Sequence, residues 1–200
     1  MLPLTTQPLL PRRPAARAVH VPVATPRRGA AEAFIARVFA ERYAARVNAF
    51  APDLMLLEQA GEVRAAAGWR GAGGQRLFLE NYLDRPAEVL ISRLAGHPVA
   101  RDKVVEVGHL ASARPGGGSD MILTLADRLH GLGYEWVIFT ATRELIGIFT
   151  KLGLPPLALA SADPARLGAA AAEWGRYYDT RPIVVAGRIR QALDVAGRRP

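Results

Sequence analysis

Apolar residues along the chain follow two different repeats, and each repeat predicts the type of element formed there. Residues 30–48 place apolar side chains three and four positions apart, which predicts an amphipathic helix. Residues 54–59 and 63–69 are apolar runs separated by Ala60-Gly61-Glu62, and this arrangement predicts a β-hairpin. Further along, the pattern predicts strands over 103–113, 136–140, 157–160 and 183–186, and helices over 77–83, 87–94, 120–130, 143–152 and 163–174.

The order of these elements predicts an α/β (α+β) protein with a mixed central sheet and helices on both faces. A chain of 200 residues is long enough for one such domain and short for two. We therefore expect a single domain over residues 29–196. Several prolines and no periodicity over residues 1–28 predict an irregular basic arm, and residues 197–200 form a short basic tail.

The net charge of +8 is concentrated at the two ends of the chain. Residues 29–197 contain 19 basic and 18 acidic side chains, so the predicted domain is nearly neutral. Arginine outnumbers lysine 24 to 2, which indicates a GC-rich genome more than phosphate binding. We therefore expect solvated basic ends and no nucleic-acid partner.

Several kinds of site are excluded by residues that the chain lacks or scatters. There is no cysteine, which excludes disulfides, thiolate metal sites and a cysteine nucleophile, and which suits a cytoplasmic protein. The four histidines are scattered without the spacing of metal ligands, so we expect no metal. A Gly-x-Ser-x-Gly elbow is also lacking, which argues against a serine hydrolase.

The sequence predicts neither a secretory signal nor a membrane span. Pro3 and Pro8 interrupt the first apolar stretch and arginines follow it, although an acid-free, arginine-rich leader also fits an organelle transit peptide. The longest apolar stretch, from Val137, carries Arg143 and Glu144 near its centre. Because charges are costly inside a bilayer, this stretch is better explained as a strand followed by an amphipathic helix. We expect membrane association to be peripheral at most.

A glycine-rich turn between a predicted strand and a predicted helix indicates an anion site. The strand covers residues 103–113, glycines follow at 116–118, and Ser119 is a good N-cap for the helix. The unpaired N–H groups at a helix start favour an anion. Arg114 and Gly117 loosely fit the Arg-x-x-Gly-x-Gly/Ala loop that binds the coenzyme A pyrophosphate in GNAT-type acyltransferases. The alternative is an ordinary strand-to-helix turn.

Two glutamates lie where the pattern predicts burial, and a buried carboxylate needs a partner or a function. Glu106 is inside an apolar strand, where desolvation raises the pKa of a carboxyl toward the range of a general base. Its alternative role is a structural carboxylate paired with an arginine such as Arg101 or Arg143. Glu80 follows Leu79 in a segment of apolar and aromatic residues, which raises the same question.

Six segments of the chain, taken in order, resemble the thermostable hemolysin family over about residues 35–190. They read LFLENYLD, PAEVLISR, VVEVGHLAS, WVIFTAT, KLGLPPLALASADPARL and WGRYYDTRPIVVAG. That family in turn resembles the GNAT superfamily and the acyl-homoserine-lactone synthases. The resemblance implies a GNAT-like, mostly antiparallel sheet with splayed central strands. It also implies an N-acyltransferase that moves a fatty acyl group from acyl-CoA or acyl carrier protein to the amine of a small acceptor such as an amino acid.

The resemblance further implies where the donor would bind. The splayed strands would be Val104–Ala113 and Trp136–Thr140, with the pantetheine arm of the donor in the gap between them. A backbone N–H at or near Leu110 would polarise the thioester carbonyl. The donor-binding residues implied in this way are Leu110, Ala111, Arg114, Gly116, Gly117, Gly118, Ser119 and Thr140.

The catalytic candidates are Glu106, His109 and Glu80. Strict alternation places His109 on the strand face opposite Glu106, unless Gly108 marks a bulge that brings the two side chains together. Glu80 lies on the segment that covers the acceptor pocket in the resembling folds, where it would bind the ammonium of the substrate or take its proton through water. The alternative for Glu80 is a hydrogen bond that holds this segment in place. The candidate substrate-binding residues are Tyr82, Arg101, Arg143, Trp174 and Tyr178.

The chain departs from the acyl-homoserine-lactone synthases after its strand glutamate. Those enzymes carry an arginine there, whereas this chain has Val107, Gly108 and His109, which argues against homoserine-lactone synthesis. Two other functions compete with N-acyl transfer. One is a membrane-active, hemolysin-type protein, which the lack of a strongly basic amphipathic helix disfavours. The other is a non-catalytic module that binds an acyl thioester.

Overall fold

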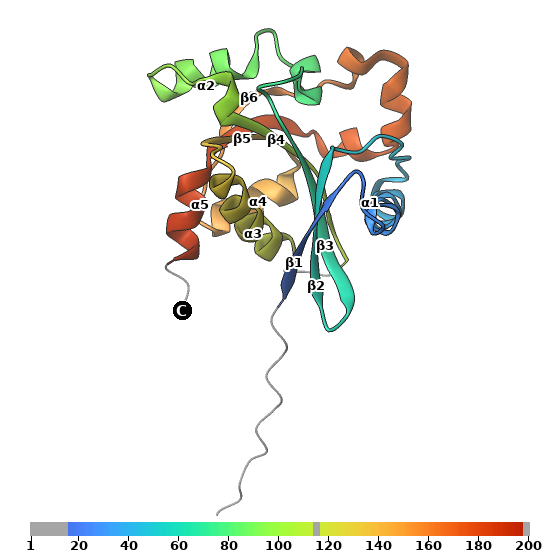
Figure 1. The fold of residues 1–200 in the computed structure, drawn as a ribbon. Coiled ribbons are helices and arrows are strands. Elements are labelled where there is room, and N and C mark those ends of the chain that lie inside the picture. The colour runs from blue at the N-terminus through green and yellow to red at the C-terminus, as the bar shows by residue number, and fades with distance from the viewer. Residues whose placement is uncertain (1–15, 114–116, 198–200) are drawn as a thin grey trace, which may run out of the picture.

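One seven-stranded sheet, in the order β1-β2-β3-β4-β5-β7-β6, forms the centre of the protein in a computed structural model that describes residues 16–113 and 117–197 (Figure 1). The strands are β1 (Arg17–Pro22), β2 (Asp53–Gln59), β3 (Glu62–Gly71), β4 (Val104–Ser112), β5 (Trp136–Ala141), β6 (Leu157–Ser161) and β7 (Ile183–Arg188). The pair β4–β5 is parallel and the other neighbouring pairs are antiparallel. The predicted mixed, mostly antiparallel sheet is therefore confirmed.

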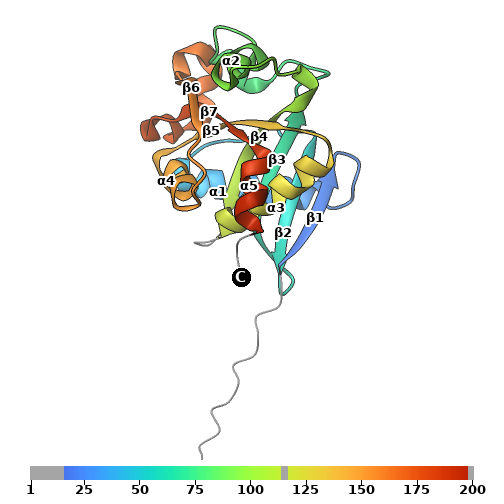
Figure 2. The same cartoon turned by 90° about the vertical axis from the view of Figure 1, so that its left-hand side faces the viewer.

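Helices cover both faces of this sheet, as Figures 1 and 2 show from two directions. The α-helices are α1 (Arg28–Tyr43), α2 (Ala87–Ala95), α3 (Gly117–Gly131), α4 (Arg143–Lys151) and α5 (Ile189–Ala196). Short 3₁₀ segments occupy Phe78–Asn81, Arg101–Lys103, Pro164–Trp174 and Tyr177–Thr180. Helix α1 packs on one face and helices α3 and α5 pack together on the other.

The residues of β2 show how the two faces are filled. Leu54 and Leu56 join the core cluster under α1, whereas Met55 and Leu57 join the cluster under α3 and α5. Side chains alternate between the faces of a strand, so an entirely apolar run is expected where both faces are covered. All four side chains are buried. The strand therefore anchors both layers of the core.

The parallel pair β4–β5 is short compared with the strands that form it. Its ladder joins Val104 to Trp136, Val105 to Val137 and Glu106 to Ile138, and it ends there. Strand β4 continues to Ser112 along its other neighbour, β3, and β5 continues along β7. The two central strands therefore separate beyond Glu106, which confirms the predicted splay.

A β-bulge lies in β4 just after the point of separation. The β3–β4 register shifts between Ala66 and Gly68, and His109 has a positive φ of 56°. Non-glycine residues adopt this conformation rarely, and an extra residue of this kind bends and twists the strand that carries it. Of the two arrangements that the sequence left open, the bulge is therefore the one present, with His109 as its left-handed residue and Gly108 next to it.

Several features differ from the elements predicted from the sequence. The first helix ends at Tyr43 and does not reach residue 48, and the helices predicted over 77–83 and 163–174 are 3₁₀ segments. The arm predicted to be irregular over residues 1–28 contains β1, which pairs with β2, because strand pairing tolerates proline at the end of an edge strand. Helix α5 was not predicted, although Ile189 and Ala192 give it a buried face. Helix α3 begins by Gly117, so Ser119 lies in its first turn and is not its N-cap.

We predict that Gly68→Ala destabilises the fold. A Cβ at Gly68 would lie 2.8 Å from Leu54 Cδ2, 2.9 Å from the Ala51 Cβ and 3.2 Å from His109 Nδ1. Overpacking of this kind costs about 1–3 kcal/mol. Urea unfolding at pH 7 should show this loss, whereas the control Gly74→Ala, which meets nothing within 4 Å, should change stability little. Equal stability of both variants would contradict the packing described here.

Candidate active site

A cavity of about 550 Å³ occupies the gap between β4 and β5. It receives side chains from both faces of the sheet, because the separated strands leave an opening through which the two sides communicate. On the side of α3 and α4 the lining is apolar and includes Met121, Leu125, Phe139, Leu145, Ile148 and Phe149. On the side of α1 it is polar and aromatic and includes Tyr43, Arg70, Tyr82, Glu106, His109, Trp174 and Tyr178.

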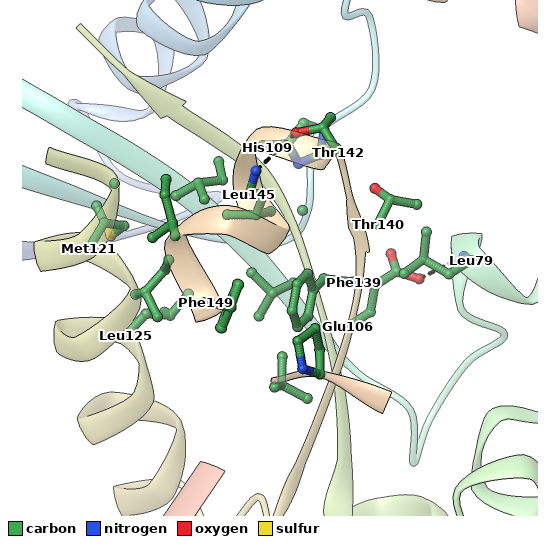
Figure 3. A pocket seen from close by; sticks show the side chains of 18 of the residues that line it. Leu79, Glu106, His109, Met121, Leu125, Phe139, Thr140, Thr142, Leu145 and Phe149 are labelled. Carbon is green, nitrogen blue, oxygen red and sulfur yellow. Dashed lines mark hydrogen bonds between the residues drawn. The ribbon is translucent and has the colours of Figure 1, made fainter. Parts of the chain in front are cut away.

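Helices α3 and α4 make the apolar half of the cavity. Helix α4 has no buried residue, yet Leu145, Ile148 and Phe149 are partly buried and line the cavity. Phe149 stacks on Phe139 of β5 with ring centroids 4.8 Å apart. Figure 3 shows Met121, Leu125 and Phe149 grouped on this side, across the strands from Glu106. The lining of this half is therefore apolar and aromatic, as in sites that bind an aliphatic chain.

Glu106 is the buried carboxylate of the other half, with 7% of its surface exposed. Its Oε2 accepts a hydrogen bond of 2.8 Å from the Leu79 N–H (Figure 3). Its Oε1 lies 3.4 Å from Arg70 Nε. Burial raises the pKa of Glu106, and the hydrogen bond from Leu79 and the charge of Arg70 offset this effect only in part. A carboxyl group whose pKa is raised in this way is a better proton acceptor than an ordinary carboxylate.

Arg70, which the sequence analysis did not single out, is the cation beside this carboxylate. It lies on β3 directly opposite Glu106 in the β3–β4 register, so both side chains lie on the same face of the sheet. Arg101 and Arg143, the arginines named as possible partners of Glu106, are elsewhere. Only the cross-strand register identifies Arg70, and the sequence pattern does not fix that register.

His109 is directed to the same face as Glu106 because of the bulge. Its Nε2 lies 3.1 Å from the Ala49 carbonyl oxygen, which only accepts hydrogen bonds, so Nε2 carries the proton. Its ring packs against Phe50, with centroids 5.5 Å apart. Burial lowers the pKa of His109 to about 4 despite the bond to Ala49, and the charge of Arg70 adds to this effect. The imidazole is therefore neutral at pH 7.

Glu80 is equally buried but its oxygens are fully engaged. It accepts hydrogen bonds of 3.0 Å from the Leu77 and Ala87 N–H groups and of 2.7 and 2.9 Å from the two Nη atoms of Arg101. Burial raises its pKa, but these hydrogen bonds outweigh burial and lower the pKa to about 2. Arg101 also binds Glu88 at 2.6 Å. This geometry favours the structural alternative for Glu80 and leaves Arg101 committed to two carboxylates.

Aromatic side chains form the wall of the polar half. Tyr82 and Tyr178 share a hydrogen bond of 2.6 Å between their hydroxyl groups, and burial raises the pKa of both, so both are neutral. Tyr177 donates a bond of 2.9 Å to Thr140 Oγ1, which fixes this residue of β5 at the opening. Trp174 packs against Tyr177 with centroids 5.4 Å apart. The predicted residues Tyr82, Thr140, Trp174 and Tyr178 thus come together.

The predicted donor-binding residues are only partly brought together. Leu110 lines the cavity, as does Gly118 at the start of α3, whereas Ala111 is buried in the core under α1. A Cβ at Gly117 would lie 2.7 Å from Ser112 Oγ and 3.3 Å from the Arg64 carbonyl oxygen, so a side chain there would have to displace the serine hydroxyl. Arg114 and Gly116 lie outside the described residues. Ser119 and the exposed Arg143 are not among the cavity-lining residues.

Two further observations concern the described residues as a whole. Among residues 16–113 and 117–197, no cluster of three or more histidine, aspartate or glutamate side chains is placed to hold a metal ion. In the same part of the chain, every helix is too short or too polar to cross a lipid bilayer.

Comparison with known proteins identifies relatives of this arrangement. A family model described as Thermostable hemolysin matches residues 21–193. A search of curated proteins found no significant match to the sequence.

Solved structures give closer information on the fold. TofI in an apo form has a TM-score of 0.62 at 16% identity, covering 92% of this chain and 98% of its own. FeeM, an N-acyl amino acid synthase from uncultured soil microbes, has a TM-score of 0.57 at 13% identity, covering 89% and 94%. BjaI, a CoA-dependent acyl-homoserine-lactone synthase solved with SAM and isopentyl-CoA, has a TM-score of 0.60 at 13% identity, covering 90% and 87%. These likenesses confirm the predicted GNAT-like fold.

We predict that Glu80→Gln destabilises the protein, because the variant removes the charge that holds Arg101. Breaking a largely buried ion pair should cost about 2–4 kcal/mol at pH 7. Since the folded-state pKa of Glu80 is lowered to about 2, its contribution is complete above the ordinary carboxyl pKa of 4.5 and is lost as pH falls from there toward 2. Urea unfolding across this range should show the difference between wild type and variant shrinking.

The matched control for this prediction is Glu88→Gln. Glu88 contacts the same arginine, but its removal leaves the Glu80–Arg101 pair intact, so we expect a loss below about 1 kcal/mol. A Glu80→Gln protein as stable as the control at pH 7 would show that the carboxylate is not a structural anchor.

Proposed function

The chain belongs to the thermostable hemolysin family, and we propose that it is an N-acyltransferase. In this proposal a fatty acyl group passes from acyl-CoA or acyl carrier protein to the amine of a small acceptor such as an amino acid. Support comes from the fold, which it shares with an N-acyl amino acid synthase and with CoA-dependent acyl-homoserine-lactone synthases. That likeness concerns the fold, so the argument for activity rests on the cavity.

One observation carries the proposal: the cavity crosses the sheet at the point where β4 and β5 separate. Residues 107–112 of β4 continue beyond the β4–β5 ladder, so the edge of β4 that faces β5 lies along the cavity. A strand edge offers N–H and C=O groups to any extended amide chain. The pantetheine arm of an acyl thioester is such a chain, and it fits this edge.

The donor would lie across both halves of the cavity. Its fatty chain suits the apolar half between α3 and α4, and its diphosphate or carrier-bound phosphate suits the first turn of α3, whose N–H groups favour anions. Gly117 supports this placement, because the lack of a side chain there leaves the start of α3 close to Ser112 at the end of β4. The thioester carbonyl then lies in the opening, where the Leu110 N–H is a candidate to polarise it.

The acceptor would occupy the polar half, with Glu106 as the general base. An ammonium group beside Glu106 gives up a proton to the carboxylate, and the neutral nitrogen attacks the thioester carbon. The new N–C bond forms and the C–S bond breaks, and the departing thiolate takes up the second proton that the nitrogen loses as it becomes an amide. Glu106 is favoured as base because burial raises its pKa, whereas burial lowers the pKa of His109 to about 4 and encloses its unprotonated Nδ1.

His109 supports this site in a different way. Its left-handed backbone forms the bulge, and its ring fastens β4 to the Ala49 carbonyl between α1 and β2. We therefore assign it the role of positioning the separated part of β4 rather than of moving protons.

The family name raises the competing possibility of direct membrane lysis. A fatty acyl group joined to a polar amine is itself surface-active, so an acyltransferase in a crude preparation could lyse red cells through its product. Purified protein added to red cells without an acyl donor should therefore cause no lysis. Prompt lysis under these conditions would favour the membrane-active function instead.

Activity is tested directly with purified protein, long-chain acyl-CoA and a panel of amino acids. We expect thiol release and an N-acyl product of the corresponding mass. Glu106→Gln should lower kcat by about 10²–10⁴-fold because the base is lost, while thermal shifts with acyl-CoA stay as in wild type. Glu41→Gln, an exposed change on α1, serves as the control with normal activity. If Glu106→Gln kept full activity, Glu106 could not be the base.

The pH dependence of kcat/KM provides a separate check. Because burial raises the pKa of Glu106, the carboxylate should become protonated, and activity should fall, at a pH above the ordinary carboxyl value of 4.5. His109, with a pKa of about 4, stays neutral over this range and should not contribute. Glu106→Gln should lack this acid limb. A limb at or below 4.5 in wild type would contradict the raised pKa.

A further inference from the structure

We propose that Arg70 is the binding group for the α-carboxylate of the acceptor, which makes the acceptor a free α-amino acid and not a simple amine. This inference rests on the proposed acyl transfer and deepens it, because it names the chemical class that the polar half selects. It concerns a residue that the sequence pattern did not indicate.

The first support is the incomplete bonding of Arg70. Its Nε is buried and has no hydrogen-bond acceptor among the described residues, although Glu106 Oε1 lies 3.4 Å away as a long ionic contact. Arg101 differs sharply, since two carboxylates already hold its Nη atoms at 2.6–2.9 Å. A buried guanidinium donor without an acceptor is costly, and a bound carboxylate would satisfy it.

The second support is the position of Arg70 in the cavity. It lines the polar half, and its side chain retains 22% exposure, so a ligand can reach it. Its Nε lies 3.4 Å from Glu106 Oε1 across the β3–β4 pair, and its charge lowers the pKa of both Glu106 and His109. Arg70 thus lies in the polar half of the cavity, beside the proposed base.

The third support is the match between this pair of charges and one class of ligand. Glu106 and Arg70 face each other across neighbouring strands, a carboxylate beside a guanidinium. An α-amino acid carries its ammonium and its carboxylate on one carbon, so it presents the opposite charges at the same short spacing. The ammonium can then lie at Glu106 while the carboxylate binds Arg70, and each buried charge gains a partner.

The aromatic lining of the cavity indicates the kind of side chain that such an amino acid carries. The rings of Tyr43, Phe78, Tyr82, Trp174 and Tyr178 line the same cavity as the two charges. Aromatic walls favour apolar or aromatic groups. Phenylalanine is therefore a suitable probe.

The test compares three acceptors with one acyl-CoA: phenylalanine, phenylalaninamide and phenethylamine. The last two keep the amine and the ring but lack the carboxylate. We expect kcat/KM for wild type to favour phenylalanine by about 10- to 100-fold, the usual weight of a hydrogen bond to a charged group. Equal rates with all three acceptors in wild type would overturn the proposal without any variant.

Arg70→Met tests the residue itself. Because loss of Arg70 also raises the pKa of Glu106, all rates can fall, so the readout is the ratio of phenylalanine to phenylalaninamide activity. We expect this ratio to drop by about 10- to 100-fold in Arg70→Met and to recover partly in Arg70→Lys, which restores one charge without the fork. The control Arg93→Met, an exposed change on α2, should keep the wild-type ratio. An unchanged ratio in a folded Arg70→Met protein would refute the assignment.

Calorimetry with phenylalanine and phenylalaninamide, without any acyl donor, separates this inference from the proposed function. Binding of phenylalanine that Arg70→Met abolishes would support the carboxylate site even if no acyl transfer is found, and the enzyme proposal alone would fail. Acyl transfer at equal rates to amines with and without a carboxylate would support the enzyme proposal, and the carboxylate site alone would fail.

Discussion

The early end of the β4–β5 ladder is the constraint on which the rest of the site depends. Parallel strands that stayed paired to their ends would satisfy each other's backbone groups and close the sheet. Here pairing stops at Glu106 and Ile138, and the bulge at His109 bends β4 along β3 instead. The separated edge of β4 and the cavity that Glu106 lines both follow from this one departure from regular pairing.

Two buried glutamates show how environment assigns different roles to one residue type. Glu80 receives four hydrogen bonds, two of them from a guanidinium, and its pKa falls to about 2, so it remains a fixed anion. Glu106 receives fewer, and burial dominates, so its pKa rises. The two glutamates are also linked through one segment. Glu80 accepts a hydrogen bond from the Leu77 N–H at the start of the 3₁₀ turn, and the same turn supplies the Leu79 N–H that binds Glu106. Rigid support of this kind is what an ionisable group needs in order to keep a shifted pKa.

Much of the fold could be predicted from the sequence, because apolar periodicity reports burial directly. The hairpin, β4, β5 and the burial of Glu106 all followed from such patterns. Features that depend on pairing between distant segments could not be predicted in this way. Strand β1 was missed because the segment between Arg17 and Pro22 is short, and its pairing with the distant β2 is what makes it a strand. Arg70 was missed for the same reason, since only the register places it opposite Glu106. The wrong N-cap at Ser119 reflects the difficulty of locating a helix start within consecutive glycines.

The opening through the sheet has a consequence for the order of events in the proposed reaction. The apolar half and the polar half of the cavity lie on opposite faces of the sheet, so the two substrates can enter from different sides. Both can be present together, which favours a ternary complex over a covalently modified enzyme. The product, however, would pass through the sheet, with its acyl chain on one face and its acceptor part on the other. Its departure then requires one end to be drawn lengthwise through the gap, and this step, not bond formation, would limit turnover as the acyl chain grows longer.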